Sequence, residues 1–231
     1  MNKSAVLRVL AENLAAMGVR EVLLEGDSRT VLADYTGNST DNEGGKTPWP
    51  GVLKQEAIIV NACRKCGLAA ARTHAVYGDG SETADIVFVG EAPGFEEDRL
   101  GLPFVGRAGK LLDRLLEQVG LRRKDVYICN VLKCRPPENR DPLPEEVTAC
   151  RPFLDKQLAL IKPRVICCLG LYAAQAILGT KDSMARLRAT VHYAGDVAVV
   201  PTYHTAAALR FPAYKQQIYD DLCRVRDIVY G

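Results

Sequence analysis

The chain has 231 residues, of which 48% are hydrophobic and 25% are charged, and its formal net charge is +2. These values fit a globular protein with one sizeable domain. The sequence holds no apolar run long enough to span a membrane, and its N-terminus lacks the apolar core of a signal peptide, so we expect a cytoplasmic protein. The mild positive charge is compatible with nucleic-acid binding without establishing it.

The first quarter of the chain differs in composition from the rest. Leucines at helical spacing over residues 4–17 predict a short amphipathic helix within an N-terminal extension, residues 1–24. Residues 25–55 are rich in Gly, Ser, Thr, Asn and Asp, which is typical of a flexible linker. We therefore predict that the main domain spans residues 56–231.

The main domain alternates short apolar runs with helical patterns. Apolar, β-branched runs predict buried strands over residues 85–90, 126–130, 165–170 and 197–201. Helical patterns occupy residues 108–119, 144–161, 171–178 and 212–229. Continuous apolar strands separated by helices indicate a parallel sheet that is covered on both faces. The predicted fold is a three-layer α/β/α architecture around a mainly parallel, four-stranded sheet.

Polar side chains follow three of the predicted strands. Glu91 comes after the first strand, Asn130 ends the second, and His204 follows the fourth. Ligands of parallel sheets bind beyond the carboxyl ends of the strands. The sequence therefore predicts that these three side chains converge on one crevice.

Four of the eight cysteines form a distinctive pattern, which we call the cysteine quartet. Cys63 and Cys66 form a CxxC pair, and Cys134 and Cys150 lie on either side of a polar, proline-rich stretch. Cysteines of an unexported protein are more often metal ligands or buried thiols than disulfides. We expect the quartet to hold a metal centre that joins distant loops. From the residues alone, this centre can be an iron–sulfur cluster or a tetrahedral zinc ion.

Five segments of the domain resemble those of the family 4 uracil-DNA glycosylases, the iron–sulfur branch of the uracil-DNA glycosylase superfamily. They occur in the family's order within residues 57–215. They are Gly90-Glu-Ala-Pro-Gly94, Pro103-Phe-Val-Gly106, Asn130-Val-Leu-Lys-Cys-Arg-Pro-Pro-Glu-Asn-Arg140, Cys150-Arg-Pro-Phe-Leu154 and Tyr203-His-Thr-Ala-Ala-Ala-Leu-Arg210.

The resemblance implies a [4Fe–4S] cluster bound by Cys63, Cys66, Cys134 and Cys150. Thiolates suit iron–sulfur centres, and one thiolate per iron satisfies a cubane. Structural zinc sites more often use two CxxC pairs, and this chain has one such pair among the quartet. The cluster's expected role is structural, because hydrolysis of a glycosidic bond needs no electron transfer.

The resemblance also assigns the catalytic groups. Glu91 is expected to orient or activate the attacking water and to stabilise positive charge on the deoxyribose. His204 is expected to donate a hydrogen bond to O2 of the departing uracil, where negative charge develops. Related glycosylases outside the family have an aspartate at the position of Ala92, whose backbone is expected to help hold the water. The family's usual proline after the histidine is replaced here by Thr205.

Three side chains are expected to select the base. By resemblance, Phe104 stacks on uracil, and Asn130 pairs with the O4 acceptor and the N3–H donor that distinguish uracil from cytosine. Glu97 or its neighbours would exclude the 5-methyl group of thymine. Simpler interpretations remain open for each residue, because a loop phenylalanine, a strand-end asparagine and adjacent loop acids are all common.

The predicted DNA-binding residues come from two segments. Leu209 is the candidate wedge that fills the gap left by a flipped base, although it can equally be a buried residue at the start of the C-terminal helix. The expected phosphate contacts are Lys133, Arg135, Arg140 and Arg210.

The sequence thus predicts a monomeric, monofunctional glycosylase that removes uracil from single- or double-stranded DNA. No Lys nucleophile falls at the expected pocket, so strand cleavage is not predicted. Three alternatives remain: a relative that becomes covalently trapped on its abasic product, a non-catalytic DNA-binding module of the same fold, and a zinc-stabilised nucleotide-binding protein. The partner of the N-terminal extension is not predicted.

Overall fold

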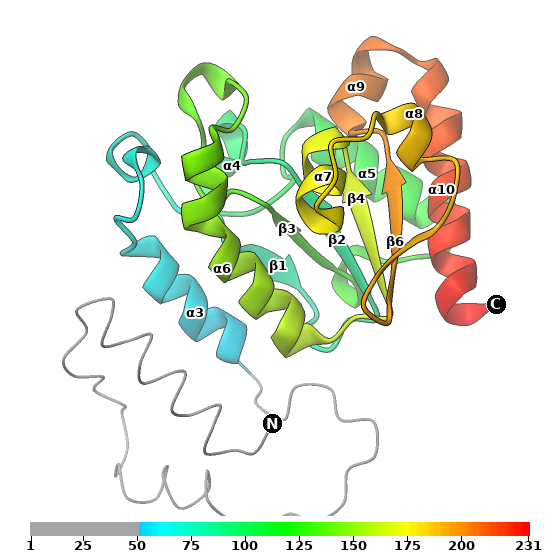
Figure 1. Ribbon diagram of the computed structural model, residues 1–231, viewed down its shortest axis with the longest axis horizontal. Helices are drawn as coiled ribbons and strands as arrows, with labels where there is room; N and C mark the ends of the chain where they lie inside the picture. The colour runs from blue at the N-terminus through cyan, green and yellow to red at the C-terminus, as the bar shows by residue number, and fades with distance from the viewer. Residues whose placement is uncertain (1–50) are drawn as a thin grey trace, which may run out of the picture. The chain divides into compact units, whose positions relative to one another are not determined.

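The structure, a computed structural model, describes residues 51–231 (Figure 1). The helix predicted over residues 4–17 and most of the predicted linker lie outside the described residues. The first described helix, α3, spans Val52–Asn61, so it crosses the boundary predicted between residues 55 and 56. Within residues 51–231, no helix combines the length and the apolar character needed to cross a bilayer.

Strands and helices alternate along the domain. The strands are β1 (Gly78–Gly80), β2 (Ile86–Gly90), β3 (Tyr127–Asn130), β4 (Val165–Leu169), β5 (His192–Ala194) and β6 (Val197–Thr202). The remaining α-helices are α4 (Phe95–Leu100), α5 (Arg107–Gln118), α6 (Pro144–Ile161), α7 (Leu171–Leu178), α8 (Met184–Leu187), α9 (Thr205–Arg210) and α10 (Ala213–Tyr230). Short 3₁₀ turns occupy Gly67–Ala70, Arg123–Asp125 and Pro137–Asn139.

The described strands form one six-stranded sheet in the order β1-β3-β2-β4-β6-β5. The central strands β3, β2, β4 and β6 are parallel, which confirms the predicted architecture. The predicted number of four strands is wrong, because β1 and β5 add antiparallel edges. Each edge strand has only three residues and no continuous apolar run, so its pairing depends on the neighbouring strand rather than on a local pattern.

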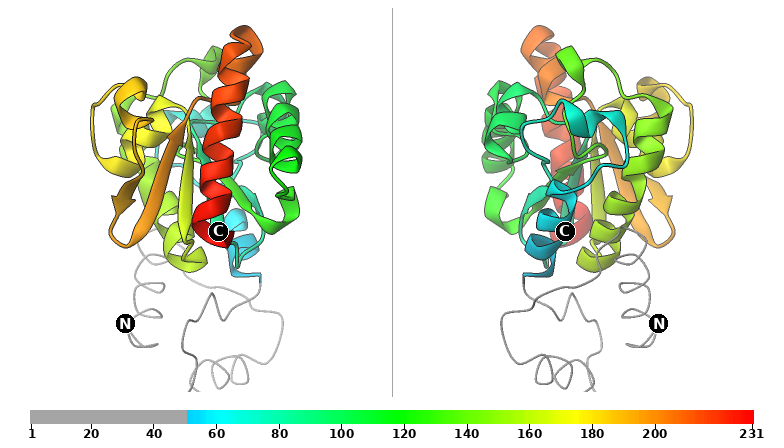
Figure 2. Two further views of the ribbon diagram at one scale, coloured as in Figure 1. Left: turned by 90° about the vertical axis from the view of Figure 1, so that its right-hand side faces the viewer. Right: turned by 90° about the vertical axis from the view of Figure 1, so that its left-hand side faces the viewer.

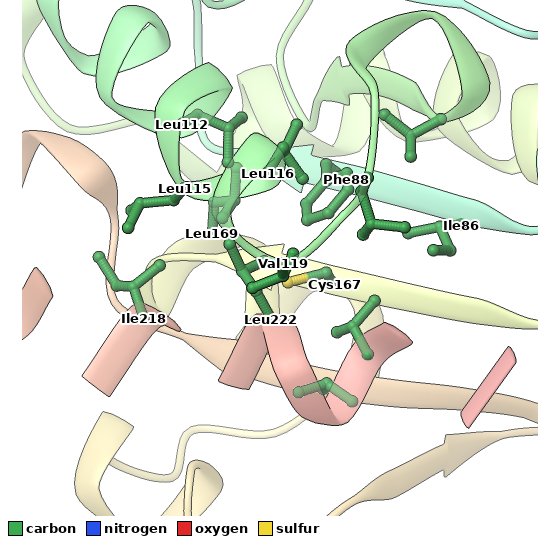
Figure 3. Close-up of a cluster of buried hydrophobic side chains, with 14 of the residues drawn as sticks. Ile86, Phe88, Leu112, Leu115, Leu116, Val119, Cys167, Leu169, Ile218 and Leu222 are labelled. Atoms are coloured by element: carbon green, nitrogen blue, oxygen red, sulfur yellow. The ribbon is translucent and has the colours of Figure 1, made fainter. Parts of the chain in front are cut away.

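Helices cover both faces of the sheet (Figure 2). α5 and α10 lie on one side, and α6 to α8 lie on the other. Alternate residues of the central strands point to opposite faces, so Phe88 of β2 and Leu169 of β4 pack against α5 and α10. There they meet Leu112, Leu116 and Leu222 (Figure 3). This packed layer fixes the carboxyl ends of the parallel strands relative to one another.

Candidate active site

A cavity of about 330 Å³ opens beyond the carboxyl ends of β2, β3 and β6. Its lining comes from five loops and helix ends, and it includes every residue that was predicted to touch uracil. The lining residues are Glu91, Ala92, Pro93, Gly94, Glu97, Phe104, Ala108, Asn130, Pro136, Asn139, Arg140, His204, Ala206 and Arg210. The volume lies at the lower end of the range for small-molecule sites.

Asn130 lines this cavity and carries an unpaired acceptor. The residue is buried, and its side-chain Oδ1 has no hydrogen-bond partner among the described residues. Gly90 lies beside it on the neighbouring strand, in register with it. A Cβ at Gly90 would clash with Asn130 Oδ1 and would lie 2.6 Å from Cζ of Phe104. The glycine therefore keeps open the space between the amide and the aromatic ring.

Lys133 is a buried residue, and its predicted contact with a DNA phosphate is incompatible with this position. Its side chain is 0% exposed. Its Nζ donates hydrogen bonds to the backbone carbonyl of Asn130 at 2.6 Å and to Oε1 of Gln157 at 2.5 Å. Gln157 in turn donates to the carbonyl of Tyr77 and to the hydroxyl of Tyr127. The ammonium group thus holds the strand end from which the Asn130 side chain projects.

Phe104 occupies a strained loop that is fixed from two sides. Its φ of 52° is a left-handed value that side chains rarely adopt. Oε1 of Glu97 accepts hydrogen bonds from the backbone N–H groups of Val105 and Gly106, both at 2.8 Å. Arg123 donates to the carbonyls of residues 103 and 104 at 2.6 and 3.2 Å. Glu97 therefore anchors the aromatic loop as well as lining the cavity.

His204 lies beside Phe104 in the cavity lining, with ring centroids 5.5 Å apart. It is the N-cap of α9, and its Nδ1 accepts a hydrogen bond from the N–H of Ala206 at 3.1 Å. Burial of the ring lowers its pKa to about 4, and the opposing effect of Glu97 is smaller. The imidazole is therefore neutral at pH 7, and its remaining proton is on Nε2, which is left as a donor.

Glu91 is the carboxylate of the site and is half-buried. Burial and, to a smaller extent, the negative charge of Asp141 together raise its pKa to about 7. Asp141 accepts a hydrogen bond from the hydroxyl of Tyr172 at 2.6 Å. A carboxyl group with a pKa near neutrality can exchange a proton with water at physiological pH.

The arginines predicted to contact phosphate differ in their partners. Arg210 is exposed at the rim of the cavity. Arg135 donates to Asn139 at 2.8 Å and lies over the ring of Phe95. Arg140 forms a salt bridge of 2.5 Å with the buried carboxylate of Glu146. Arg140 therefore also stabilises the start of α6, where Glu146 accepts from the N–H of Leu143.

The cysteine quartet brings together the loop after α3, the loop after β3 and helix α6. Cys134 and Cys150 are buried, Cys63 and Cys66 are half-buried, and all four are free thiols. Burial raises the pKa of Cys134, and the nearby thiols of Cys63 and Cys66 add to this shift. Burial, together with the nearby thiols of Cys134 and Cys66, raises the pKa of Cys150 to about 11. Among residues 51–231, no three or more His, Cys, Asp or Glu are arranged to hold a metal ion.

Hydrogen-bond donors surround the quartet sulfurs. Arg72 Nη1 donates to Cys134 Sγ at 3.0 Å, and its Nη2 donates to the carbonyls of Asn61 and Cys63. The backbone N–H of Lys133 donates to Cys150 Sγ at 3.2 Å. Donors of this kind suit thiolates that carry negative charge, as metal-bound cysteines do. These two donors would stabilise ionised sulfurs at Cys134 and Cys150.

Several site residues have no signal in the sequence pattern. Arg72 and Arg123 read as ordinary surface charges, because their partners are mostly backbone carbonyls that only the folded chain brings near. Asn139 falls within a segment that resembles the family, but it was not assigned a role. Its position in the cavity lining could have been inferred from its place next to Arg140.

Comparison with known proteins identifies the family. The model of the uracil DNA glycosylase superfamily matches residues 77–223. A type-4 uracil-DNA glycosylase of Archaeoglobus fulgidus is 48% identical over 177 residues, which cover 73% of this chain and 89% of that protein. The type-4 enzyme of Thermotoga maritima is 50% identical over 65% of this chain and 80% of its own length. The chain belongs to the type-4 branch of the uracil-DNA glycosylase superfamily.

A type-5 relative is less similar to this chain than the type-4 relatives are. The type-5 uracil-DNA glycosylase of Thermus thermophilus is 34% identical over 57% of this chain and 68% of its own length. The family match spans the strand ends, the Phe104 loop and α9, which together form the cavity. Residues 63 and 66 lie before the matched range of the superfamily model.

Proposed function

We propose that the protein excises uracil from DNA by hydrolysing the N-glycosidic bond, which leaves an abasic site. The observation that carries this proposal is the cavity of about 330 Å³ that Asn130, Phe104 and His204 line together, with the buried side-chain Oδ1 of Asn130 left unpaired. An unsatisfied buried acceptor is costly in the free protein. A ligand with an N–H group next to a carbonyl would remove that cost.

Asn130 supplies base selectivity in this proposal. Its Oδ1 accepts from N3–H of uracil, and its Nδ2 donates to O4. Cytosine presents the reverse pattern at these two positions, so each mismatched pair would cost about 1–3 kcal/mol. The bond from Lys133 to the Asn130 carbonyl restricts the backbone from which the amide projects.

Phe104 and Glu97 complete the base pocket. The ring of Phe104 stacks on the pyrimidine, an interaction worth about 1–3 kcal/mol per base. Hydrogen bonding cannot exclude thymine, so the segment containing Glu97 must limit the space at C5. The two hydrogen bonds that Glu97 accepts from the Phe104 loop make that wall stiff.

His204 and Glu91 act on the reacting atoms. When the C1′–N1 bond breaks, its electron pair moves into the uracil ring and charge accumulates on O2, which accepts a hydrogen bond from Nε2–H of neutral His204. Ionised Glu91 stabilises the positive charge on the sugar and orients the water that attacks C1′. The water proton passes to Glu91 and then to solvent, and the uracil anion is protonated after it leaves.

The chemistry stops at base removal in this proposal. An abasic-site lyase needs an amine that attacks C1′. No lysine is among the cavity-lining residues of the described chain, and Lys133 is enclosed with its ammonium already bonded. The protein is therefore assigned as a monofunctional glycosylase.

The quartet of Cys63, Cys66, Cys134 and Cys150 would hold a [4Fe–4S] cluster. The four thiols and the N–H donors around them fit such a group, which would supply a structural cross-link rather than a reaction step. It would join the loop after α3 to the loop after β3, four residues beyond Asn130. Arg135, Arg140 and Arg210 would contact phosphates around the cavity.

Incubation of the purified, iron-loaded protein with uracil-containing oligonucleotides, followed by alkali cleavage, tests the proposal. Wild-type protein should yield a cleaved strand and free uracil. Glu91→Gln and His204→Ala should lower turnover by about 100-fold or more with little loss of DNA binding. Arg226→Gln, at a half-buried position on α10, serves as a control that should keep full activity.

Other outcomes identify the alternatives. A gel-stable protein–DNA adduct would indicate the covalently trapped relative. Binding without base release would indicate a non-catalytic module. Zinc in place of iron in the purified protein would overturn the cluster assignment alone.

A further inference from the structure

A single exposed aromatic ring stands at the junction of α9 and α10. Phe211 is 59% exposed and lies between Arg210, the last residue of α9, and Pro212, which precedes α10. Figure 1 shows this junction at the end of the domain toward which the β6 arrow points. Arg210 and Ala206 of α9 line the cavity, so Phe211 follows directly after its rim.

Leu209, the wedge predicted from the sequence, has a different environment. It is half-buried and packs against the hydrophobic core beneath α9. A side chain that enters a base stack must be free to leave the protein surface. Leu209 would first have to give up its core contacts, whereas Phe211 would not.

Isolated exposed apolar residues are common and need no explanation by themselves. Phe211 differs because an aromatic stack supports it. Its ring is tilted by 58° against Tyr214, with centroids 5.7 Å apart. Tyr214 is stacked on Tyr203 with centroids 4.0 Å apart and an interplanar angle of 5°.

Arg188 connects the inner end of this aromatic stack to the core. The guanidinium of Arg188 lies 5.1 Å from the ring centroid of Tyr203. Arg188 also donates at 2.6 Å to the carboxylate of Asp221, which is fully buried and accepts a further bond from the Thr202 hydroxyl at 2.6 Å. The Phe211 ring is therefore held in place by the stack beneath it, so inserting this ring into DNA would require little further loss of conformational entropy.

We propose that Phe211 inserts into the base stack of duplex DNA at the position vacated by the flipped nucleotide. This assignment rests on the proposed function, since it concerns how the same cavity receives its base. Glycosylases extrude their target at the cost of unstacking, and apolar side chains inserted between base steps offset that cost. A phenyl ring suits this role because every base presents a π-face.

The proposal predicts an effect that depends on how hard the base is to flip. Losing one aromatic–base stack should lower kcat/KM on U·A duplexes by roughly 5- to 100-fold. The loss should be smaller at U·G mismatches, where flipping is easier, and absent on single-stranded DNA. A residue needed only for folding or chemistry would affect all three substrates alike.

The experiment compares Phe211→Ala with wild type on U·A duplex, U·G duplex and single-stranded oligonucleotides under single-turnover conditions. Phe211→Leu should restore much of the duplex activity, because it keeps an apolar side chain. Tyr193→Ala is the matched control: this exposed ring (69%) is on edge strand β5, and its loss should leave all three rates unchanged. Fluorescence of 2-aminopurine next to uracil reports flipping directly and should rise less with Phe211→Ala.

Each contrary result has a distinct meaning. Equal losses on duplex and single-stranded DNA, or wild-type rates on all substrates, would overturn the assignment of Phe211. A duplex-specific loss in Leu209→Ala together with an inert Phe211→Ala would return the role to Leu209. Wild-type protein that releases no uracil from any substrate would refute the proposed function and this inference with it.

Discussion

The pKa of Glu91 determines how activity should depend on pH. Burial and the charge of Asp141 raise this pKa to about 7. If the ionised carboxylate acts on the water and the sugar, the active fraction rises from about one-tenth at pH 6 to about nine-tenths at pH 8, so kcat/KM should increase about tenfold over that range. His204 contributes no change in this window, because its pKa is about 4 and it stays neutral throughout.

Single-turnover rates on a uracil oligonucleotide between pH 5 and 9 measure this rise of activity with pH, which we call the acidic limb of the profile. Asp141→Asn should move the limb to lower pH, but only part of the way to the ordinary carboxyl value, because burial is the larger cause of the shift. Glu91→Gln should give a low, flat profile. A wild-type limb near the ordinary pKa of a glutamate, or a limb that survives in Glu91→Gln, would refute the assigned role.

The raised pKa of Glu91 affects stability in the opposite direction to activity: activity rises with pH, whereas the contribution of this group to stability falls. The folded-state pKa of Glu91 exceeds its unfolded value, so the unfolded chain releases the proton first as pH rises. The contribution of this group to stability is therefore complete below about pH 4.5 and is lost as pH rises through about 7. Glu91→Gln should raise the melting temperature relative to wild type at pH 8 and leave it unchanged near pH 4.

Three further substitutions test the positioning of the site. Gly90→Ala places a methyl group against Asn130 and Phe104, so uracil excision should fall at least 100-fold, and retained activity would show that the cavity is not the uracil site. Lys133→Met removes the donor from two buried acceptors. The free energy of unfolding, measured in urea melts, should fall by about 1–3 kcal/mol, and kcat/KM should fall as well. An unchanged urea midpoint and an unchanged rate would contradict the positioning role of Lys133. Arg72→Gln removes a charged donor to a quartet sulfur, so the iron content per chain should fall faster in air than in wild type, and equal retention would exclude this role.

The layered fold and most of the cavity follow from the amino-acid sequence alone. Buried parallel strands need continuous apolar runs, and those runs placed the four central strands to within one residue at either end. Because parallel strands end at one edge, Glu91, Asn130 and His204 could be brought together before any coordinates existed. The motifs then supplied Phe104 and the family resemblance, and comparison with known proteins confirmed the family.

The tertiary structure decided what each charged side chain contacts. Lys133 and Arg135 are two residues apart in the same motif, yet Lys133 is fully buried and Arg135 is only half-buried. A local pattern does not distinguish them, because burial depends on α6 and its Gln157, which are distant in sequence. Leu209 and Phe211 differ in the same way, since the core beneath α9 holds one and leaves the other free. The sequence specifies the chemistry of each side chain, but how far that side chain is exposed depends on the packing of the folded chain.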